Sequence, residues 1–408
     1  MRHPLRPAPV PALAASRCIG LVVLLALGVL LAPSAPARAQ DEARILIGDI
    51  TTTDRIGEPA LSYRRGWELA LSYISLAGGI MGHRPIEVVP IDPQGDPSAA
   101  ARAVEDLKDQ GAVLFMGGMV ADVTLAAARA AGDTPFLAVD ARLPAAMVER
   151  QPNLFQLGPS AEALGRALAA EVAGGPASHW GVVAQDDYFG RALAHAFWNA
   201  LTSARPDITL AMEHYIEPLS GDISPALDAV RAGHPHGLLV GLRDGDLVAF
   251  VDGAAAEGLL GGLVVVAPQM GSADLMAALR GRVPQGWVTT GYPCCAFGGQ
   301  PHRAFVESYE RANPGAGMPT LGALYGYTAM TTLATALERT WSIEPKEITE
   351  ELRRMSMMTP VGEIRFDGMI RQSSLPMWVG GLASDGRGDG QFTQARRLNP
   401  ITLTRQDR

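Results

Sequence analysis

Short apolar runs alternate with longer amphipathic segments along most of this chain. Runs rich in β-branched and aromatic residues, typical of buried strands, lie at residues 44–50, 86–92, 112–117, 135–140 and 153–157. Between the first two runs, apolar residues from Trp67 to Ala77 recur at steps of three and four, which predicts one apolar stripe on a helix ending at Gly78. This alternation predicts βαβ units, in which helices cover both faces of a parallel sheet.

A second series of the same kind follows. Ser160 is placed to cap a helix that carries Leu164 and Leu168 on one face. Further strand candidates lie at residues 180–185, 208–216, 237–242, 263–268 and 286–290. The two series predict two successive α/β sheets. Because no linker rich in Gly, Ser or Pro separates them, we expect tight crossovers to join the two lobes.

The C-terminal part of the chain adds elements that two finished domains in tandem would not need. Its pattern predicts helices at residues 302–312, 321–340 and 345–355, and short strands at 362–366 and 377–382. The simplest arrangement is that the chain returns to the first lobe and later revisits the second. At 408 residues the chain is long enough for two domains of ordinary size.

The N-terminus has the features of a secretory signal peptide. Arg2, Arg6 and Arg17 precede an apolar run at residues 19–32, and Ala37-Arg38-Ala39 supplies small residues before Gln40. The run is shorter than the roughly 20 residues that a transmembrane helix needs. Cys18 comes before the run rather than after it, so a lipoprotein is not expected. We therefore predict cleavage after residues 1–39, a periplasmic location, and no membrane span in the mature chain.

Charge and cysteine content limit the classes of partner and of cross-link that this chain is expected to have. The chain has 34 basic and 42 acidic residues, and the signal segment removes only arginines, so the remainder is more acidic still. Lysine occurs only at Lys108 and Lys346, which disfavours nucleic acid as a partner. The adjacent Cys294 and Cys295 cannot staple distant segments, and the sequence leaves open whether they are reduced thiols or a vicinal disulfide.

Several short motifs follow one another in a particular order along the chain. They are Gly78-Gly79-Ile80-Met81-Gly82, Asp92 with Asp96-Pro97, Asp187-Tyr188-Phe189-Gly190, Tyr325-Gly326-Tyr327, Thr359-Pro360-Val361-Gly362 and Phe366-Asp367. In this order they resemble the type I periplasmic binding proteins of the branched-chain amino acid (leucine/isoleucine/valine) family, and the similarity runs from about Arg44 to about Leu382. Each motif alone is weak, but their order is specific for the fold and much less so for the ligand.

The resemblance implies an α/β fold with two Rossmann-like lobes, parallel sheets flanked by helices, joined by three hinge crossovers. It places the first lobe at residues 41–158 and 292–360, and the second lobe at 159–291 and 361–408. A ligand is then clamped between the lobes, and closure presents a surface to an inner-membrane ABC permease. Independently, the rule for open α/β sheets places binding groups beyond the C-terminal ends of the strands.

In amino-acid-binding members the loop after the third strand receives the ligand carboxylate. This chain has Met119, Ala121 and Asp122 in that loop, and no small hydroxyl residue before Thr124. Backbone N–H groups there can still receive an anion, whereas Asp122 is expected to cap the following helix. Thr52 and Thr53, after the first strand, are candidate hydrogen-bond donors at the cleft mouth, although a plain turn explains them nearly as well.

Two residues of the second lobe depart from the family pattern. The resemblance implies an acid for the ligand's ammonium group after Pro268, but the residue there is Gln269. A neutral amide cannot pair with an ammonium, so a standard α-amino acid is disfavoured as ligand. The tyrosine expected after residues 237–242 is replaced by Arg243, whose planar fork suits carboxylates. A surface ion pair with a neighbouring Asp is an equal alternative for Arg243.

The first lobe offers a second arginine. Asp140 and Arg142 follow the fourth strand and are able to pair with each other, and one arginine per lobe would suit an organic acid. Tyr188 and Tyr292 are candidate aromatic walls, and Cys294 lies in an apolar segment at the expected cleft rim. Ordinary packing, or a turn that joins the lobes, remains an alternative for these three.

Signatures of catalysis are missing from the sequence. It has no G-x-S-x-G elbow, no Walker phosphate loop, and no G-x-G-x-x-G after the first strand. His234 and His236 lack a third ligand at metal-site spacing. We therefore expect a binding protein for an organic acid or a ligand with a polar head and an apolar body, without enzymatic activity or cofactor. A ligand-sensing module of a signalling system is the alternative, and an unrecognised enzyme is a weak third.

Overall fold

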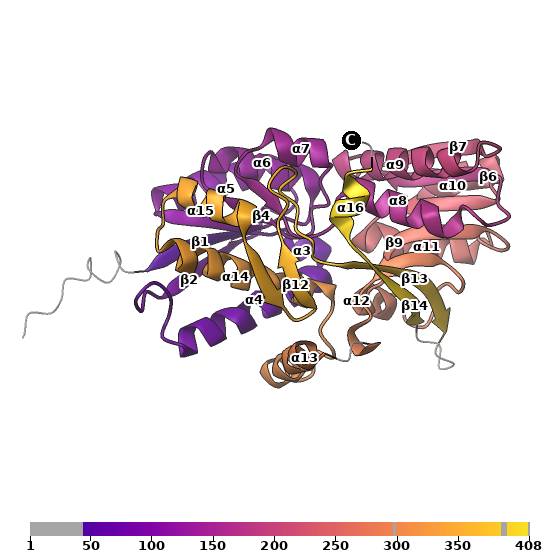
Figure 1. Cartoon of the computed structure of the whole chain (residues 1–408). Coiled ribbons are helices and arrows are strands. Elements are labelled where there is room, and N and C mark those ends of the chain that lie inside the picture. The colour runs from indigo at the N-terminus through magenta and orange to yellow at the C-terminus, as the bar shows by residue number, and fades with distance from the viewer. Residues whose placement is uncertain (1–43, 297–298, 385–389, 407–408) are drawn as a thin grey trace, which may run out of the picture. The chain divides into compact units, whose positions relative to one another are not determined.

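Two sheets organise the part of the chain that the structure describes, residues 44–296, 299–384 and 390–406 of a computed structural model. The segment predicted as a signal peptide, which includes Cys18, lies outside these residues. From Ile45 onward the chain forms one unit, and its α/β class is the one that the sequence predicts (Figure 1). None of the described helices combines the length and apolar character needed to cross a membrane.

The first sheet has five strands, and all of their pairings are parallel. In spatial order they are β2 (Ile86–Ile91), β1 (Ile45–Ile50), β3 (Ala112–Gly117), β4 (Phe136–Ala138) and β5 (Leu154–Gln156). Each lies within a predicted apolar run. We call this sheet and the helices packed on it the first lobe.

Helices cover both faces of the first sheet, as Figure 1 shows. One face packs on α5 (Pro97–Asp109) and α6 (Ala121–Ala131), and the other on α4 (Glu58–Leu76), α14 (Leu321–Thr340) and α15 (Pro345–Arg354). Short helices α3 (Thr53–Ile56) and α7 (Ala145–Arg150) follow β1 and β4. Strand β1 has every residue buried and alternates between the faces, with Leu46 and Ile50 in one core cluster and Ile45 and Ile47 in the other.

The second sheet has seven strands and is mixed. In spatial order they are β14 (Gly390–Leu398), β13 (Met377–Ser384), β10 (Val288–Gly291), β9 (Val264–Gly271), β8 (Gly237–Gly241), β6 (His179–Gln185) and β7 (Thr209–Ile216). Strands β6 to β10 pair in parallel, whereas β13 runs antiparallel to β10 and β14 antiparallel to β13. We call this sheet and its helices the second lobe.

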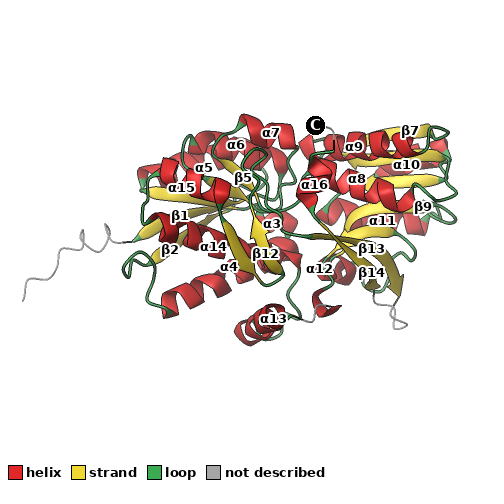
Figure 2. Ribbon diagram, in the orientation of Figure 1, coloured by secondary structure: helices red, strands yellow, loops and turns green. Residues whose placement is uncertain are grey.

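The second lobe is also covered on both faces (Figure 2). One face packs on α8 (Ala161–Val172) and α9 (Tyr188–Ala204), and the other on α10 (Ser224–Gly233), α11 (Asp244–Ala256) and α12 (Ala273–Ala278). Ser160 caps α8 as predicted, because its hydroxyl accepts from the amide of Ala163 at 3.1 Å. The terminal α16 (Pro400–Thr404) packs on α8.

The remaining elements connect the lobes. The chain passes between them after β5, after β10 and before β13, and the second passage includes η1 (Cys294–Ala296) and leads into α13 (Gln300–Ala312). A separate antiparallel pair, β11 (Ser356–Thr359) and β12 (Gly362–Arg365), precedes the last passage. This order agrees with a chain that revisits each lobe. The residue boundaries given above for the lobes stay a prediction.

Helices α4 and α14 approach each other at backbone distance, and glycines make this possible. A Cβ added at Gly326 would lie 2.0 Å from the carbonyl oxygen of Tyr63, and one added at Gly66 would lie 2.2 Å from that of Ala323. No side chain fits in that space without separating the helices. The two helices therefore form a fixed wall of the first lobe.

A buried carboxyl ties β1 to α4. The Oδ1 of Asp49 accepts from the hydroxyls of Thr51 (2.7 Å) and Tyr63 (3.2 Å), and its Oδ2 accepts from the indole Nε1 of Trp67 (3.1 Å). Burial raises the pKa of Asp49 to about 6, although these hydrogen bonds and Arg64 oppose the shift. The folded protein therefore holds this proton at a pH where the unfolded chain has lost it.

The raised pKa of Asp49 predicts a pH-dependent stability. Between about pH 4 and pH 6 the folded state binds more protons than the unfolded state, so stability from Asp49 is lost as pH rises through this window, up to about 3 kcal/mol. Urea unfolding of wild type and Asp49→Asn at several pH values measures the difference. The wild type should lose stability relative to the variant as pH rises. Parallel curves would contradict the prediction, and the exposed Asp109→Asn is the control.

Candidate functional site

Loops from both lobes meet at the C-terminal ends of β3, β4, β8 and β9. They bring together Met119, Asp140, Arg142, Arg243 and Gln269, all of which the sequence singled out. This is the edge of a sheet at which open α/β proteins bind ligands. The five residues form one hydrogen-bonded network across the two lobes.

Asp140 lies at the centre of the network. Its two carboxylate oxygens accept from Nε (2.9 Å) and Nη2 (2.8 Å) of Arg142, a bidentate pair that is almost completely buried. Burial lowers the pKa of Arg142, an effect that Asp140 opposes and the nearby Arg243 reinforces. The pairing of these two residues, which the sequence left open, is therefore present.

Arg243 reaches from the second lobe into the first. Its Nη1 donates to the carbonyl of Met119 (2.7 Å), and its Nη2 donates to the carbonyl of Asp140 (3.2 Å) and lies 3.6 Å from Oδ2 of Asp140. Arg243 is only 4% exposed. The alternative of a surface ion pair with a neighbouring Asp is therefore wrong, because the guanidinium lies inside the junction of the lobes.

Gln269 makes a second bridge between the lobes. Its Nε2 donates to Oδ2 of Asp140 at 2.9 Å, and its backbone N–H donates to the hydroxyl of Thr290 at 2.9 Å. The amide thus takes the role of a neutral donor to a carboxylate. This agrees with the expectation that the position does not supply a negative charge.

Phe189 supports both guanidinium groups. The Cζ atoms of Arg142 and Arg243 lie 5.5 Å and 5.3 Å from the centre of its ring. An aromatic face attracts a guanidinium at this range, most strongly where water is excluded. The ring is fully buried. It therefore packs in the protein interior and also contacts both guanidinium groups.

Three non-glycine residues of these loops have left-handed backbone conformations. Arg142, Asp244 and Gln269 have φ values of 53°, 48° and 67°. Such conformations cost on the order of 1 kcal/mol or more each for residues with a Cβ, and they persist where the surrounding structure requires them. Each turn aims its side chain toward the junction of the lobes rather than along the strand.

Unpartnered donors lie in the same region. Within residues 44–296, 299–384 and 390–406, Oγ1 of Thr52, Nη1 of Arg142 and Nε of Arg243 are buried without a hydrogen-bond partner. Burying an unsatisfied donor costs about 1–3 kcal/mol, so such groups are explained where a ligand supplies the acceptor.

A small cavity adjoins this network. Its lining comes from both lobes and consists of Pro59, Met119, Asp140, Asp244, Gln269, Ser272, Asp274, Leu275, Leu321 and Gly322. The space open to the centre of a water-sized molecule is about 20 Å³, room for roughly one water. A larger guest therefore requires the lobes to separate or the bridging side chains to move.

Sequence reasoning missed several residues of this cavity. Ser272 and Asp274, at the start of α12, were not singled out, and Asp244 was considered only as a partner of Arg243. Tyr325 was noted only as a motif residue. It is buried close to the network, and its pKa is raised by burial and by the charge of Asp140. Its position in the long helix α14 gave no sign of this placement.

The other predicted residues of the first lobe and of α9 lie around this centre. Thr52 and Ala121 are buried, whereas Thr53 begins α3 and donates to the carbonyl of Thr51. Asp122 is exposed in the first turn of α6, whose N-cap is Val120 without a side-chain hydrogen bond, so the expected capping by Asp122 is wrong. Tyr188 is 39% exposed at the start of α9.

Tyr292 and Cys294 belong to a different cluster. The hydroxyl of Tyr292 lies at hydrogen-bond distance from Nε2 of His302, and its ring packs against Trp378. Cys294 packs against the same cluster of aromatic and aliphatic side chains. The structure thus places both residues in the passage between β10 and α13, apart from the cavity lining.

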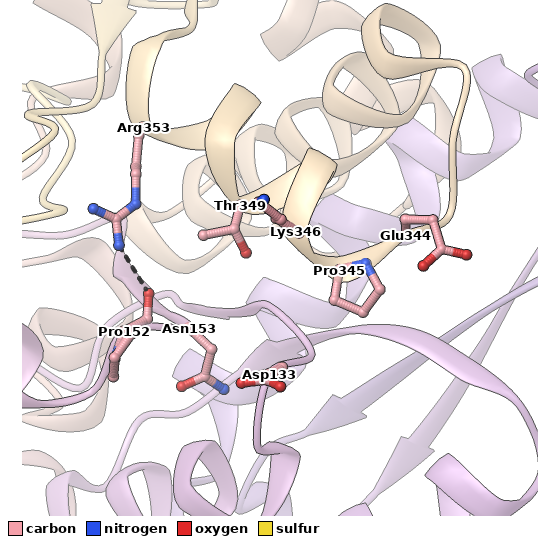
Figure 3. A pocket seen from close by; sticks show the side chains of 8 residues that line it. All are labelled: Asp133, Pro152, Asn153, Glu344, Pro345, Lys346, Thr349 and Arg353. Carbon is pink, nitrogen blue, oxygen red and sulfur yellow. Dashed lines mark hydrogen bonds between the residues drawn. The ribbon is translucent and has the colours of Figure 1, made fainter.

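A larger pocket, of about 440 Å³, lies on the first lobe at α15 (Figure 3). Two of its polar side chains already have partners of their own: Nη2 of Arg353 donates to the carbonyl of Pro152 at 3.5 Å, and the amide of Asn153 donates to the carbonyls of Ala128 and Thr134. The network around Asp140 is therefore the stronger candidate site.

Comparison with solved structures identifies proteins of the same fold. A solute-binding protein of an ABC transporter from Rhodopseudomonas palustris BisB5, in complex with 3,4-dihydroxybenzoic acid, has a TM-score of 0.77 and 19% identity, covering 88% of this chain and 98% of that chain. An isoleucine-bound substrate-binding protein of a branched-chain amino acid transporter from Streptococcus pneumoniae has a TM-score of 0.75 and 16% identity, with 88% and 100% covered.

A third structure, a solute-binding protein of an R. palustris ABC transporter in complex with benzoate, has a TM-score of 0.75 and 19% identity over 87% of this chain and 98% of that chain. No curated protein sequence matches the chain. The sequence model of the periplasmic binding proteins, however, matches residues 47–387, which is most of the chain. The resemblance seen in the short motifs is thereby confirmed, and the chain belongs to the periplasmic binding protein family.

Proposed function

We propose that this protein is the periplasmic substrate-binding component of an ABC transporter, and that it closes on a small organic ligand between its two lobes. The family and the fold support this role. Secretion follows from the signal peptide predicted at residues 1–39. The loaded protein then presents its closed form to an inner-membrane permease, and the ligand leaves chemically unaltered.

One observation carries the proposal. Arg142 from the first lobe and Arg243 from the second are buried side by side on the ring of Phe189, and each retains an unpartnered N–H group within the described residues. Guanidinium groups in this arrangement are suited to an acceptor that binds both lobes at once, and a carboxylate is the simplest such acceptor. A ligand that bridges the lobes stabilises the closed form.

The ligand is an organic acid with an apolar body rather than a standard α-amino acid. Leu275, Leu321 and Pro59 provide apolar lining next to the polar centre. Three structural neighbours bind benzoate, 4-hydroxybenzoate or 3,4-dihydroxybenzoic acid, which have this character. Gln269, a neutral residue whose amide already donates to Asp140, cannot hold an α-ammonium group.

Free leucine, isoleucine and valine should therefore give no thermal stabilisation at millimolar concentration. Binding to the native state raises the melting temperature, and an ammonium on the carbon next to the carboxylate would meet Arg142 and Arg243 without a compensating acid at position 269. Differential scanning fluorimetry checks this. A clear upward shift with any of the three would contradict the assignment.

Native mass spectrometry of protein purified from its own periplasm tests the function itself. We expect one co-purified small molecule per chain that is released unchanged after denaturation. Conversion of that molecule on incubation with the protein would overturn the proposal in favour of an enzyme. Co-purification with a sensor kinase instead of a permease would favour a signalling role.

A further inference from the structure

Carboxylates dominate one wall of the cavity between the lobes. Asp140, Asp244 and Asp274 all line it, and two guanidinium groups of the described residues, those of Arg142 and Arg243, lie within ion-pair distance of Asp140. Taking charged groups out of water is expensive unless each has a partner of opposite charge. The three carboxylates outnumber these two guanidinium groups, which leaves surplus negative charge at the cavity wall.

The surplus belongs to Asp244 and Asp274 rather than to Asp140. Asp140 accepts from both guanidinium nitrogens of Arg142 and from Gln269. Within the described part of the chain, Asp274 accepts only from local backbone amides, including that of Leu275 at 3.1 Å. Among the described residues none donates a hydrogen bond to the carboxylate of Asp244, although this residue is only 8% exposed.

Ser272 gives an independent indication at the same wall. It is the N-cap residue of α12, yet its side chain makes no capping hydrogen bond, and it is only 4% exposed. Its hydroxyl has no partner in the part of the chain that the structure describes, and the residue lines the cavity between Gln269 and Asp274. A largely buried residue whose hydroxyl lines a cavity and forgoes its cap is explained by a ligand atom within reach of that hydroxyl.

We propose that Asp244, Asp274 and Ser272 bind a basic nitrogen of the ligand, a group distinct from the acid that Arg142 and Arg243 bind. This inference rests on the proposed function and specifies its ligand class: a molecule with a carboxylate and a separate ammonium or amidinium group. The two carboxylates supply charge, and the hydroxyl of Ser272 supplies a further acceptor. Three acceptors match the three N–H donors of a primary ammonium.

The electrostatics of this wall agree with such a ligand. Burial raises the pKa of Asp244, although Arg243 and Arg142 oppose the shift. Burial also raises the pKa of Asp274 to about 6, and the charges of Asp244 and Glu58 add to this effect. A bound cation would relieve both desolvated carboxylates, whereas a neutral hydroxyl would satisfy their hydrogen bonding without balancing their charge.

Matched pairs of compounds test the proposal directly. para-(Aminomethyl)benzoate is compared with para-(hydroxymethyl)benzoate, and an ω-amino alkanoate with the ω-hydroxy alkanoate of the same length, by calorimetry and thermal shift at pH 7. Each pair keeps size and carboxylate constant and changes only the charge of the distal group. We expect the amine of at least one pair to bind about tenfold tighter or better than its alcohol.

Variants show which residues produce the preference for the amine over the alcohol. Asp274→Asn and Asp244→Asn should each reduce the ratio of amine to alcohol affinity about tenfold, while the exposed Asp228→Asn on α10 should leave it unchanged. Asp274 is partly exposed, so its variant should fold even if Asp244→Asn does not. Because asparagine preserves the size of the side chain, a loss of preference reports charge.

The outcomes distinguish a failure of the basic-nitrogen site from a failure of the proposed binding function. Equal or tighter binding of the alcohols, or an amine preference that survives both variants, would overturn the basic-nitrogen site and leave the binding function standing. If neither the amines nor the alcohols stabilise the protein at millimolar concentration, both the proposed organic-acid ligand and the proposed basic-nitrogen site are contradicted.

Discussion

Replacing Asp140 by alanine should lower the free energy of unfolding by about 3–5 kcal/mol. The substitution leaves Arg142, which is 1% exposed, without the carboxylate that accepts two of its hydrogen bonds. An uncompensated buried charge is among the most destabilising changes known in proteins. It also removes the acceptor shared by Gln269 and Arg243, so both bridges between the lobes are weakened. Urea unfolding followed by circular dichroism measures the effect.

An exposed ion pair supplies the matched control. Asp186 and Arg191 lie 2.6 Å apart on the surface of the second lobe, with side chains 44% and 57% exposed. Asp186→Ala should cost at most about 1 kcal/mol, because exposed pairs gain little in water. If Asp140→Ala proves as mild as Asp186→Ala, the network around Asp140 does not hold the lobes in the manner described.

Arg243→Ala should weaken binding of the co-purified ligand at least about tenfold. A charge-assisted hydrogen bond in a buried site contributes roughly 1.5–3 kcal/mol, and the substitution removes the buried, unpartnered Nε that is proposed to donate to the ligand. The guanidinium also bridges to the carbonyls of Met119 and Asp140, so the variant should favour the open form of the ligand-free protein. Calorimetry measures the affinity, and small-angle X-ray scattering measures the opening.

Arg231→Ala is the control for charge. Arg231 lies on α10 with a side chain 49% exposed and pairs with Asp228 and Glu257 at the surface. Arg231→Ala changes the net charge of the protein by the same amount as Arg243→Ala, but Arg231 lies outside the candidate site. Equal affinities of wild type and Arg243→Ala would remove Arg243 from the ligand contacts.

The pattern of apolar residues predicted most of the architecture because most strands are buried on both faces. Every residue of β1 and β8 is buried, and Asp49 in β1 is the one polar residue among them. β14 was missed for the opposite reason. It pairs only with β13, and none of its residues is fully buried, so its polar sequence gave no strand signal. The short β11 was also missed; it has four residues, pairs only with β12, and alternates between exposed and buried positions.

The candidate site was predictable where it depends on strand ends and not where it depends on turns. Asp140, Arg142 and Arg243 follow strands directly, so the rule for open sheets was enough to select them. Asp244 was considered only as a surface partner of Arg243, in one of two equal alternatives, because the sequence does not reveal the left-handed backbone at that residue, with φ of 48°. Tyr292 follows its strand equally directly, but the passage to α13 takes it into an aromatic cluster.

The glycine contact between α4 and α14 bears on how related proteins change ligand. Pro59, Leu321 and Gly322, which line the cavity, stand at the first turns of these two helices, and a Cβ at Gly322 would lie 2.5 Å from the carbonyl oxygen of Pro59. This side of the cavity has no room for larger side chains. Ligand choice should therefore diversify through the loops after β8 and β9. The helix pair α4 and α14 should present the same surface to each new ligand.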